Sequence, residues 1–114
     1  MSDALSVHLR DWDAQRAKRI ELGDDLAAQR MIDHAVVFRR KRSARSAAAA
    51  FEAKGFTVVL IPGLFRTTVE ASRVDSLTEA SVASILSEAI EIADAYGGLY
   101  DGFGGTIVPE SDEG

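Results

Sequence analysis

The chain has 114 residues, of which 46% are hydrophobic and 27% charged, and its formal net charge is -5. This length and composition fit one globular domain and exclude a wholly disordered chain. The absence of cysteine excludes disulfides and thiolate metal sites. No apolar run resembles a signal peptide or approaches the roughly 20 residues of a membrane span. The negative charge also argues against a dedicated nucleic-acid binder, so we expect a protein without membrane contact or direct RNA binding.

Residues 5–22 are predicted to form a first helix that ends at Gly23. Its apolar stripe is expected to dock it on the domain: Leu5, Leu9, Trp12 and Ile20. A helix that binds a partner is the alternative.

Residues 30–38 are predicted to form a strand with two largely apolar faces, which indicates a central position with both faces at least partly covered. Alternation places Asp33 and His34 on opposite faces, so they cannot easily form one acid–base pair. His34 is expected to approach Tyr100 or Asp101 on a neighbouring strand.

A helix over 43–54 follows, with Ser43 as the expected N-cap. Its buried face is predicted to hold four residues: Ala44, Ala47, Ala48 and Phe51. Residues 56–61 and 64–74 read as two strands joined by a tight turn at Pro62-Gly63, which predicts a hairpin.

The longest helix is predicted over 79–96, with Thr78 as its N-cap. One face is apolar, and the opposite face is acidic through Glu88, Glu91 and Asp94. A last strand is predicted over 99–108, and its closely spaced glycines indicate a bulge rather than a dinucleotide-binding loop.

After the first helix the element order is β-α-β-β-α-β, which predicts an α+β, ferredoxin-like sandwich. The expected antiparallel sheet order is 4-1-3-2, with both crossover helices on one face. The predicted organisation is a docked helix at 1–22, the domain at 23–109 and a short acidic tail at 110–114. The second sheet face needs a cover, for which the first helix and a second copy in a homodimer are the candidates.

The sequence carries no convincing catalytic, cofactor or metal constellation. Its two histidines lack metal-ligand spacing, and no nucleophile elbow or phosphate-binding loop is present. A structural role for His34 is favoured over catalysis. The strongest local charge signal is a basic cluster: Arg39, Arg40, Lys41, Arg42 and Arg45. This cluster could bind RNA phosphate or an acidic partner. The alternative is that it lies solvated at a strand–helix junction.

The stretch from Gly98 to Gly104, containing Tyr100-Asp101-Gly102-Phe103-Gly104, resembles the closing Tyr-Asp-Gly-Trp-Gly motif of the regulator of ribonuclease E activity B family. Gly23-Asp24 and the Arg30-to-His34 spacing are similar to further elements of that family, and the resemblance extends over about 22–108. Phe103 stands where tryptophan is usual, Gly105 is an added glycine, and the acidic tail is short.

This resemblance implies a ferredoxin-like, cytoplasmic bacterial protein without enzymatic activity. It implies binding to ribonuclease E and a lowered endonuclease activity, which alters RNA turnover. The residues expected to contact the partner are Asp33, His34, Tyr100, Asp101, Phe103, Glu88 and Glu91. Three alternatives stay open: a ligand- or partner-binding domain unrelated to ribonucleases, an enzyme that uses His34, and direct RNA binding through the basic cluster.

Overall fold

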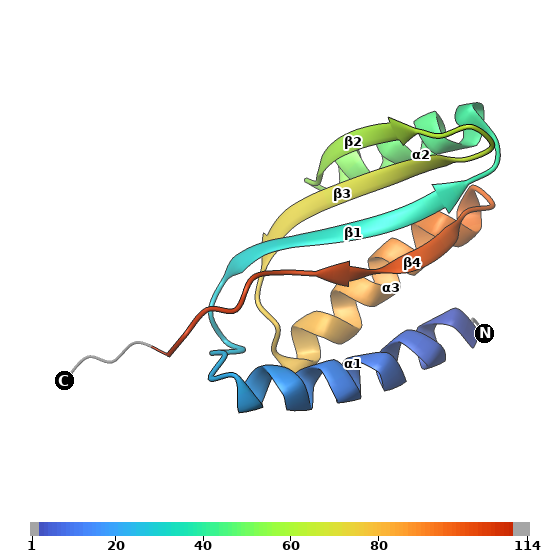
Figure 1. Cartoon of the computed structure of the whole chain (residues 1–114). Coiled ribbons are helices and arrows are strands. Elements are labelled where there is room, and N and C mark those ends of the chain that lie inside the picture. The colour runs from blue at the N-terminus through green and yellow to red at the C-terminus, as the bar shows by residue number, and fades with distance from the viewer. Residues whose placement is uncertain (1–2, 111–114) are drawn as a thin grey trace.

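The computed structural model describes residues 3–110, so most of the predicted acidic tail lies outside the described residues. Three helices and four strands follow one another along the chain (Figure 1). They are α1 (Asp3–Glu21), β1 (Arg30–Phe38), α2 (Lys41–Ala53), β2 (Thr57–Pro62), β3 (Thr67–Asp75), α3 (Glu79–Ala95) and β4 (Leu99–Gly104).

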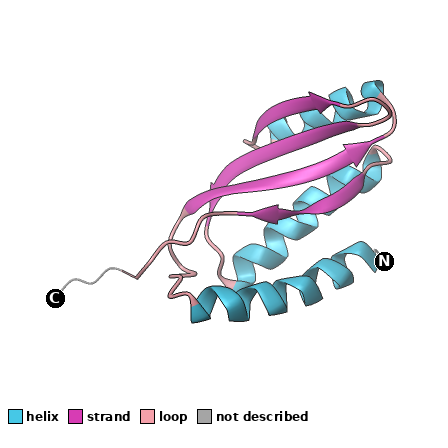
Figure 2. Ribbon diagram, viewed as in Figure 1, coloured by secondary structure: helices cyan, strands magenta, loops and turns pink. Residues whose placement is uncertain are grey.

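The four strands form one antiparallel sheet in the order β2-β3-β1-β4. Read from its other edge, this is the predicted order 4-1-3-2. Helices α2 and α3 lie behind the sheet in the view of Figure 1 and Figure 2, and α1 runs beside α3. The predicted α+β class with an additional N-terminal helix is therefore confirmed.

Strand β1 lies in the interior of the sheet, as its apolar character indicated. Its helix-facing side chains are fully buried: Ile32, His34, Val36 and Phe38. The other face is open, because Met31 is 51% exposed and Asp33 is also exposed. The second face is therefore covered only in part, at the half-buried Ala35 and Val37, which is the least that the prediction of partial cover required.

Helix α1 packs beside α3 and against β4, so it does not cover the open sheet face. Trp12 is buried in the core, and the Nε2 atom of His8 lies 3.2 Å from the backbone carbonyl of Tyr100. Ile20 is 50% exposed, which contradicts its predicted docking role. The second predicted cover, another copy of the chain, stays a prediction.

Helix α2 begins at Lys41, two residues before the expected N-cap Ser43. Arg40 takes the N-cap position and gives no side-chain cap, so the basic cluster lies directly at the helix start. Strand β3 begins only at Thr67, which makes the β2–β3 connection a four-residue loop rather than a tight turn. The backbone N–H of Gly63 donates to the carbonyl of Arg66 across 2.7 Å and closes this loop.

Helix α3 begins as predicted, because the Thr78 hydroxyl accepts a hydrogen bond from the backbone N–H of Ser81 at 3.2 Å. Its apolar stripe is buried and also includes Ile90. The predicted last residue, Tyr96, is instead the C-cap and is 39% exposed. Strand β4 ends at Gly104 rather than at Val108.

Candidate functional site

The closing strand β4 contains the predicted bulge. Val36 of β1 pairs with Tyr100, whereas the preceding Ala35 pairs with Gly102, so Asp101 is the extra residue. Gly102 adopts a φ of 134°, which glycine tolerates and other residues rarely adopt. Tyr100 and Phe103 would face opposite sides of a regular strand, but the extra residue turns both toward the helices.

His34 and Tyr100 meet in the core, as the sequence predicted. The Nδ1 atom of His34 lies 2.7 Å from the Tyr100 hydroxyl, and both side chains are buried. The rings of Phe56 and Phe103 lie 5.7 Å and 5.9 Å from the imidazole, measured between ring centroids. Phe103 in turn packs against Trp12 at 5.8 Å, so the pair belongs to an aromatic core that joins β1, β4 and α1.

Burial sets the protonation of this pair. Desolvation, aided by the positive charge of Arg73, lowers the pKa of His34 to about 4, although Asp33 and Glu88 act in the opposite sense. Desolvation also raises the pKa of the Tyr100 hydroxyl. The Nε2 atom of His34 has no hydrogen-bond partner within residues 3–110. At neutral pH the pair is uncharged and enclosed, which is the arrangement of a structural histidine.

Gly98 is the next element of the closing motif, and it allows the α3–β4 junction to pack directly against Phe38 of β1. A Cβ atom at this position would lie 2.4 Å from the ring of Phe38. Such a distance is far below van der Waals contact, so only glycine fits without displacing a core aromatic. Gly98, Tyr100 and Gly102 thus each have a specific role in closing the sheet.

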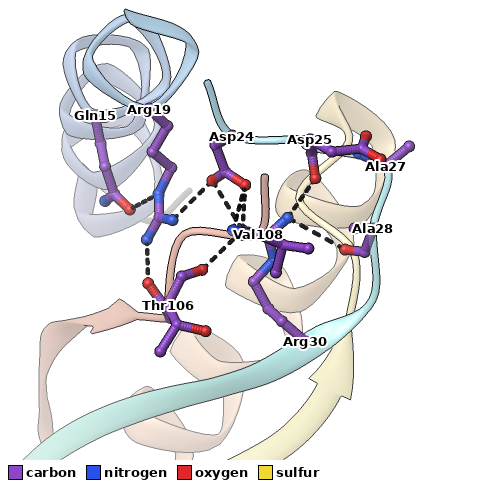
Figure 3. Close-up of polar contacts among 10 residues, drawn as sticks. Gln15, Arg19, Asp24, Asp25, Ala27, Ala28, Arg30, Thr106 and Val108 are labelled. Atoms are coloured by element: carbon purple, nitrogen blue, oxygen red, sulfur yellow. Dashed lines mark hydrogen bonds and ion pairs between the residues drawn. The ribbon is translucent and has the colours of Figure 1, made fainter. Parts of the chain in front are cut away.

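A buried ion network ties the two ends of the fold together (Figure 3). The Asp24 carboxylate accepts hydrogen bonds from Arg30 at 2.6 and 2.8 Å, from Arg19 at 3.0 Å and from the backbone N–H of Val108 at 3.1 Å. Arg30 also donates to the carbonyl of Thr106 at 2.9 Å. The end of α1, the start of β1 and the segment after β4 are therefore held at one carboxylate.

The charge state of Asp24 follows from these contacts. Burial alone would raise the pKa of Asp24, but the hydrogen bonds from Arg30, Val108 and Arg19 outweigh it and lower the pKa. In the sequence analysis, Gly23-Asp24 and Arg30 are only supporting elements of the family resemblance. The spacing of Asp24 and Arg30 does not reveal that they share one ion network. Arg19 and Arg30 also donate to the carbonyls of Gly105 and Thr106, which lie far from both arginines in the sequence.

The predicted acidic helix face is only partly free. Glu88 accepts hydrogen bonds from Arg73 at 3.0 and 3.4 Å, and Arg73 also lies 4.2 Å from the centroid of the Phe56 ring. Glu88 therefore holds α3 to the sheet, whereas Glu91 is exposed. On the open sheet face, Asp33 accepts a hydrogen bond from the Ser72 hydroxyl at 2.6 Å.

The basic cluster lies at one end of the sheet, beside an open cleft of about 530 Å³. Arg39 and Arg40 line this cleft, whereas Lys41, Arg42 and Arg45 do not. Arg66, from the β2–β3 loop, also lines it and was missed by the sequence reading. The only signal for this residue was its closeness to the turn-forming Pro62-Gly63.

Among residues 3–110, no three histidine, cysteine or carboxylate side chains gather as metal ligands would. None of the helices in that range has both the length and the apolar character of a membrane span. Four of the seven predicted contact residues line one open pocket of about 300 Å³: Asp33, His34, Asp101 and Phe103. The other three do not line it, since Tyr100 is buried in the core and Glu88 and Glu91 lie on α3.

These features define a small α+β domain with an antiparallel sheet, one open face and a last strand shaped by a bulge. Comparison with curated proteins finds no match. A family model described as regulator of ribonuclease activity B matches residues 12–105, from within α1 to just beyond β4. The chain belongs to this family.

Proposed function

We propose that this protein binds a ribonuclease, with ribonuclease E as the specific partner, and lowers its cleavage of RNA by contact rather than by chemistry. The observation that carries the proposal is the family match over residues 12–105. That range contains the central strand, both crossover helices and the whole closing strand. A role in RNA turnover places the protein in the cytoplasm, where its partner would act.

The chemistry of the core supports a regulator without catalytic activity. A general base must reach its substrate and titrate near the working pH. His34 meets neither condition, because its side chain is fully buried and its pKa is about 4. Tyr100 is similarly buried, with a raised pKa. The pair therefore supports the fold on which a binding surface is built.

The predicted contact residues include an exposed group and a buried group. Asp33, Asp101 and Glu91 are exposed, so we retain them as proposed partner contacts. His34 and Tyr100 are enclosed, so we assign them to the scaffold behind that surface.

The proposal is tested by measuring RNA cleavage by purified ribonuclease E while the folded protein is titrated in. We expect the cleavage rate to fall and to level off as the enzyme becomes saturated. Keeping the protein well below the RNA concentration but above the enzyme concentration excludes inhibition through RNA capture, because the protein can then sequester only a small part of the RNA. A full cleavage rate in the presence of excess folded protein would contradict the proposal.

A further inference from the structure

The loop between β2 and β3 presents two large apolar side chains to solvent. Leu64 is 88% exposed and Phe65 is 81% exposed. Scattered single apolar residues are ordinary on protein surfaces, but adjacent ones at this exposure gain nothing from the core. The loop backbone is nevertheless ordered by the hydrogen bond between Gly63 and Arg66.

This loop borders the cleft described above. Phe38 pairs with Thr67 in the sheet, so the residues that follow β1 and those that precede β3 lie side by side. The β2–β3 loop, the β1–α2 junction and the α3–β4 junction all lie at the same end of the molecule (Figure 1). The lining of the cleft combines arginines with apolar and aromatic side chains: Arg39, Arg40, Arg66, Val37, Tyr96 and Leu99.

The apolar part of the lining is accessible. Leu99 is 66% exposed and Tyr96 is 39% exposed. Val37, which pairs with Leu99 in the sheet, is half-buried. The surface therefore offers apolar contact area next to guanidinium groups, which is the composition of protein-binding hot spots.

The arginines of the cleft are available for a partner. In the described range, ion pairs involve Arg19, Arg30 and Arg73, and none involves the three cleft arginines. A guanidinium group binds a carboxylate with two parallel hydrogen bonds, so it favours carboxylate ligands. The local positive charge contrasts with the net charge of -5 of the whole chain.

We propose that this cleft and the adjoining Leu64-Phe65 tip bind an acidic peptide segment that carries large apolar side chains. The arginines pair with its carboxylates, while the tip, Tyr96 and Leu99 contact its apolar residues. This inference deepens the proposed function, on which it rests, by assigning the chemistry of the ribonuclease segment that is recognised.

An acidic peptide fits this surface better than RNA. RNA-binding sheets stack bases on exposed aromatic residues of the sheet face. The open face here instead carries Asp33 and Glu70 among aliphatic residues such as Val59. The aliphatic Leu64 and Leu99 are also exposed beside the arginines, and they suit the apolar side chains of a peptide rather than the phosphates of RNA.

The direct test is an NMR titration of the isotope-labelled full chain. The probe is a synthetic peptide that alternates glutamate with leucine and phenylalanine, and its counterpart has lysine in place of glutamate. We expect saturable shifts in the backbone signals of 39–43, 63–67 and 96–99 with the acidic peptide only. A single-stranded RNA oligonucleotide forms a third arm. The proposal is overturned if these signals shift with RNA or the lysine peptide but not with the acidic peptide. It is also overturned if they shift with none of the probes.

Matched variants locate the site. Arg66→Glu and Phe65→Ser alter exposed side chains of the loop, and we expect each to weaken acidic-peptide binding by about tenfold or more. Arg45→Glu is the charge control, because Arg45 belongs to the basic cluster but does not line the cleft. Leu22→Ser is the apolar control at an exposed site outside the cleft. Equal losses in the controls and the loop variants would contradict a site at this cleft.

The same variants are then titrated against ribonuclease E. We expect the wild-type chain and the two control variants to bind ribonuclease E. We expect Arg66→Glu and Phe65→Ser to lose this binding. If all variants bind ribonuclease E equally, the cleft proposal fails while the proposed function stands. If the wild-type chain binds the acidic peptide but not ribonuclease E, the proposed function fails while the cleft keeps its peptide chemistry. If the chain self-associates as its concentration rises and Phe65→Ser abolishes this, the Leu64-Phe65 tip contacts a second copy of the chain. That result would overturn the proposal.

Discussion

The Nδ1 atom of His34 and the hydroxyl of Tyr100 lie 2.7 Å apart and join the central strand β1 to the edge strand β4 inside the core. This contact explains the motif that closes the chain. Tyr100 enters the core, Asp101 forms the bulge, and Gly102 supplies the backbone conformation that the bulge requires. Tyr100 and Gly102 therefore specify fold closure, whereas the exposed Asp101 between them is free of the core.

The hydroxyl of Tyr100 is predicted to stabilise the folded state. Tyr100→Phe leaves the Nδ1 atom of His34 unpaired in the core, which we expect to lower the free energy of unfolding by about 1–3 kcal/mol. Urea denaturation measures this change. Tyr96→Phe is the matched control, because Tyr96 is exposed and should lose little. A wild-type stability for Tyr100→Phe would show that the hydrogen bond has no net effect.

Buried His34 predicts a loss of stability in mild acid. In the unfolded chain this imidazole takes up a proton near its ordinary pKa of 6.5, whereas in the folded state burial lowers its pKa to about 4. The contribution of neutral His34 is therefore complete above pH 6.5 and is lost as the pH falls toward 4. The expected decrease in unfolding free energy reaches about 3 kcal/mol.

Chemical denaturation at several pH values between 7 and 4 measures this dependence. His34→Gln should remove most of the slope, although it lowers stability overall. His8→Gln alters the other histidine of the chain and should keep the slope. Asp24 has a lowered pKa, so most of its contribution is lost below its ordinary value of 3.8 and it adds little to the slope between pH 7 and 5. An unchanged slope in His34→Gln would refute the assignment.

The tight contact between Gly98 and Phe38 can be measured with a double-mutant cycle. Gly98→Ala inserts a methyl group into the Phe38 ring position, and we expect a loss of about 1–3 kcal/mol. Phe38→Leu frees space, so the double variant should lose less than the sum of the two single variants. Gly104→Ala is the control, since a Cβ there meets nothing within 4 Å. Simple additivity would show that the two positions do not interact.

The ion network at Asp24 predicts a large effect from a small change. Asp24→Asn keeps the shape of the side chain but leaves Arg19 and Arg30 without their counter-charge in a buried site. Breaking a buried ion pair in this way costs about 3–5 kcal/mol. Thermal and urea unfolding should both report it, and added salt should change little because the network is shielded from solvent. Asp25→Asn, next in sequence but outside the ion pairs, should be much milder. A loss below about 1 kcal/mol for Asp24→Asn would contradict a central role for the network.

Periodicity predicted the order of elements, and the right-handed crossover rule then gave the sheet order. Alternation separated the two faces of β1 but did not show which of them is buried. The periodicity argument failed where the burial of a side chain depended on partners that are distant in the sequence. The spacing of Ile20 continues the stripe of α1, but Arg19 takes the buried position because Asp24 and the carbonyl of Gly105 satisfy its guanidinium. No local pattern in the helix indicates those partners.

The candidate site was less predictable than the fold. Leu64 and Phe65 read as part of a strand because both are apolar, yet the hydrogen bond from Gly63 to Arg66 places them in an exposed loop. Arg66 reaches the cleft only through the pairing of β1 with β3, a long-range contact. Sequence alone could identify the charges of the basic cluster but not which of them share a cleft.

The most direct test of the central claim is a calorimetric titration of the folded full chain into purified ribonuclease E. We predict saturable binding with a Kd of about 1 µM or tighter, and a matching decrease in RNA cleavage at the same occupancy. Binding that is absent at high micromolar concentration, with the protein shown to be folded, would contradict the assignment of ribonuclease E as its partner.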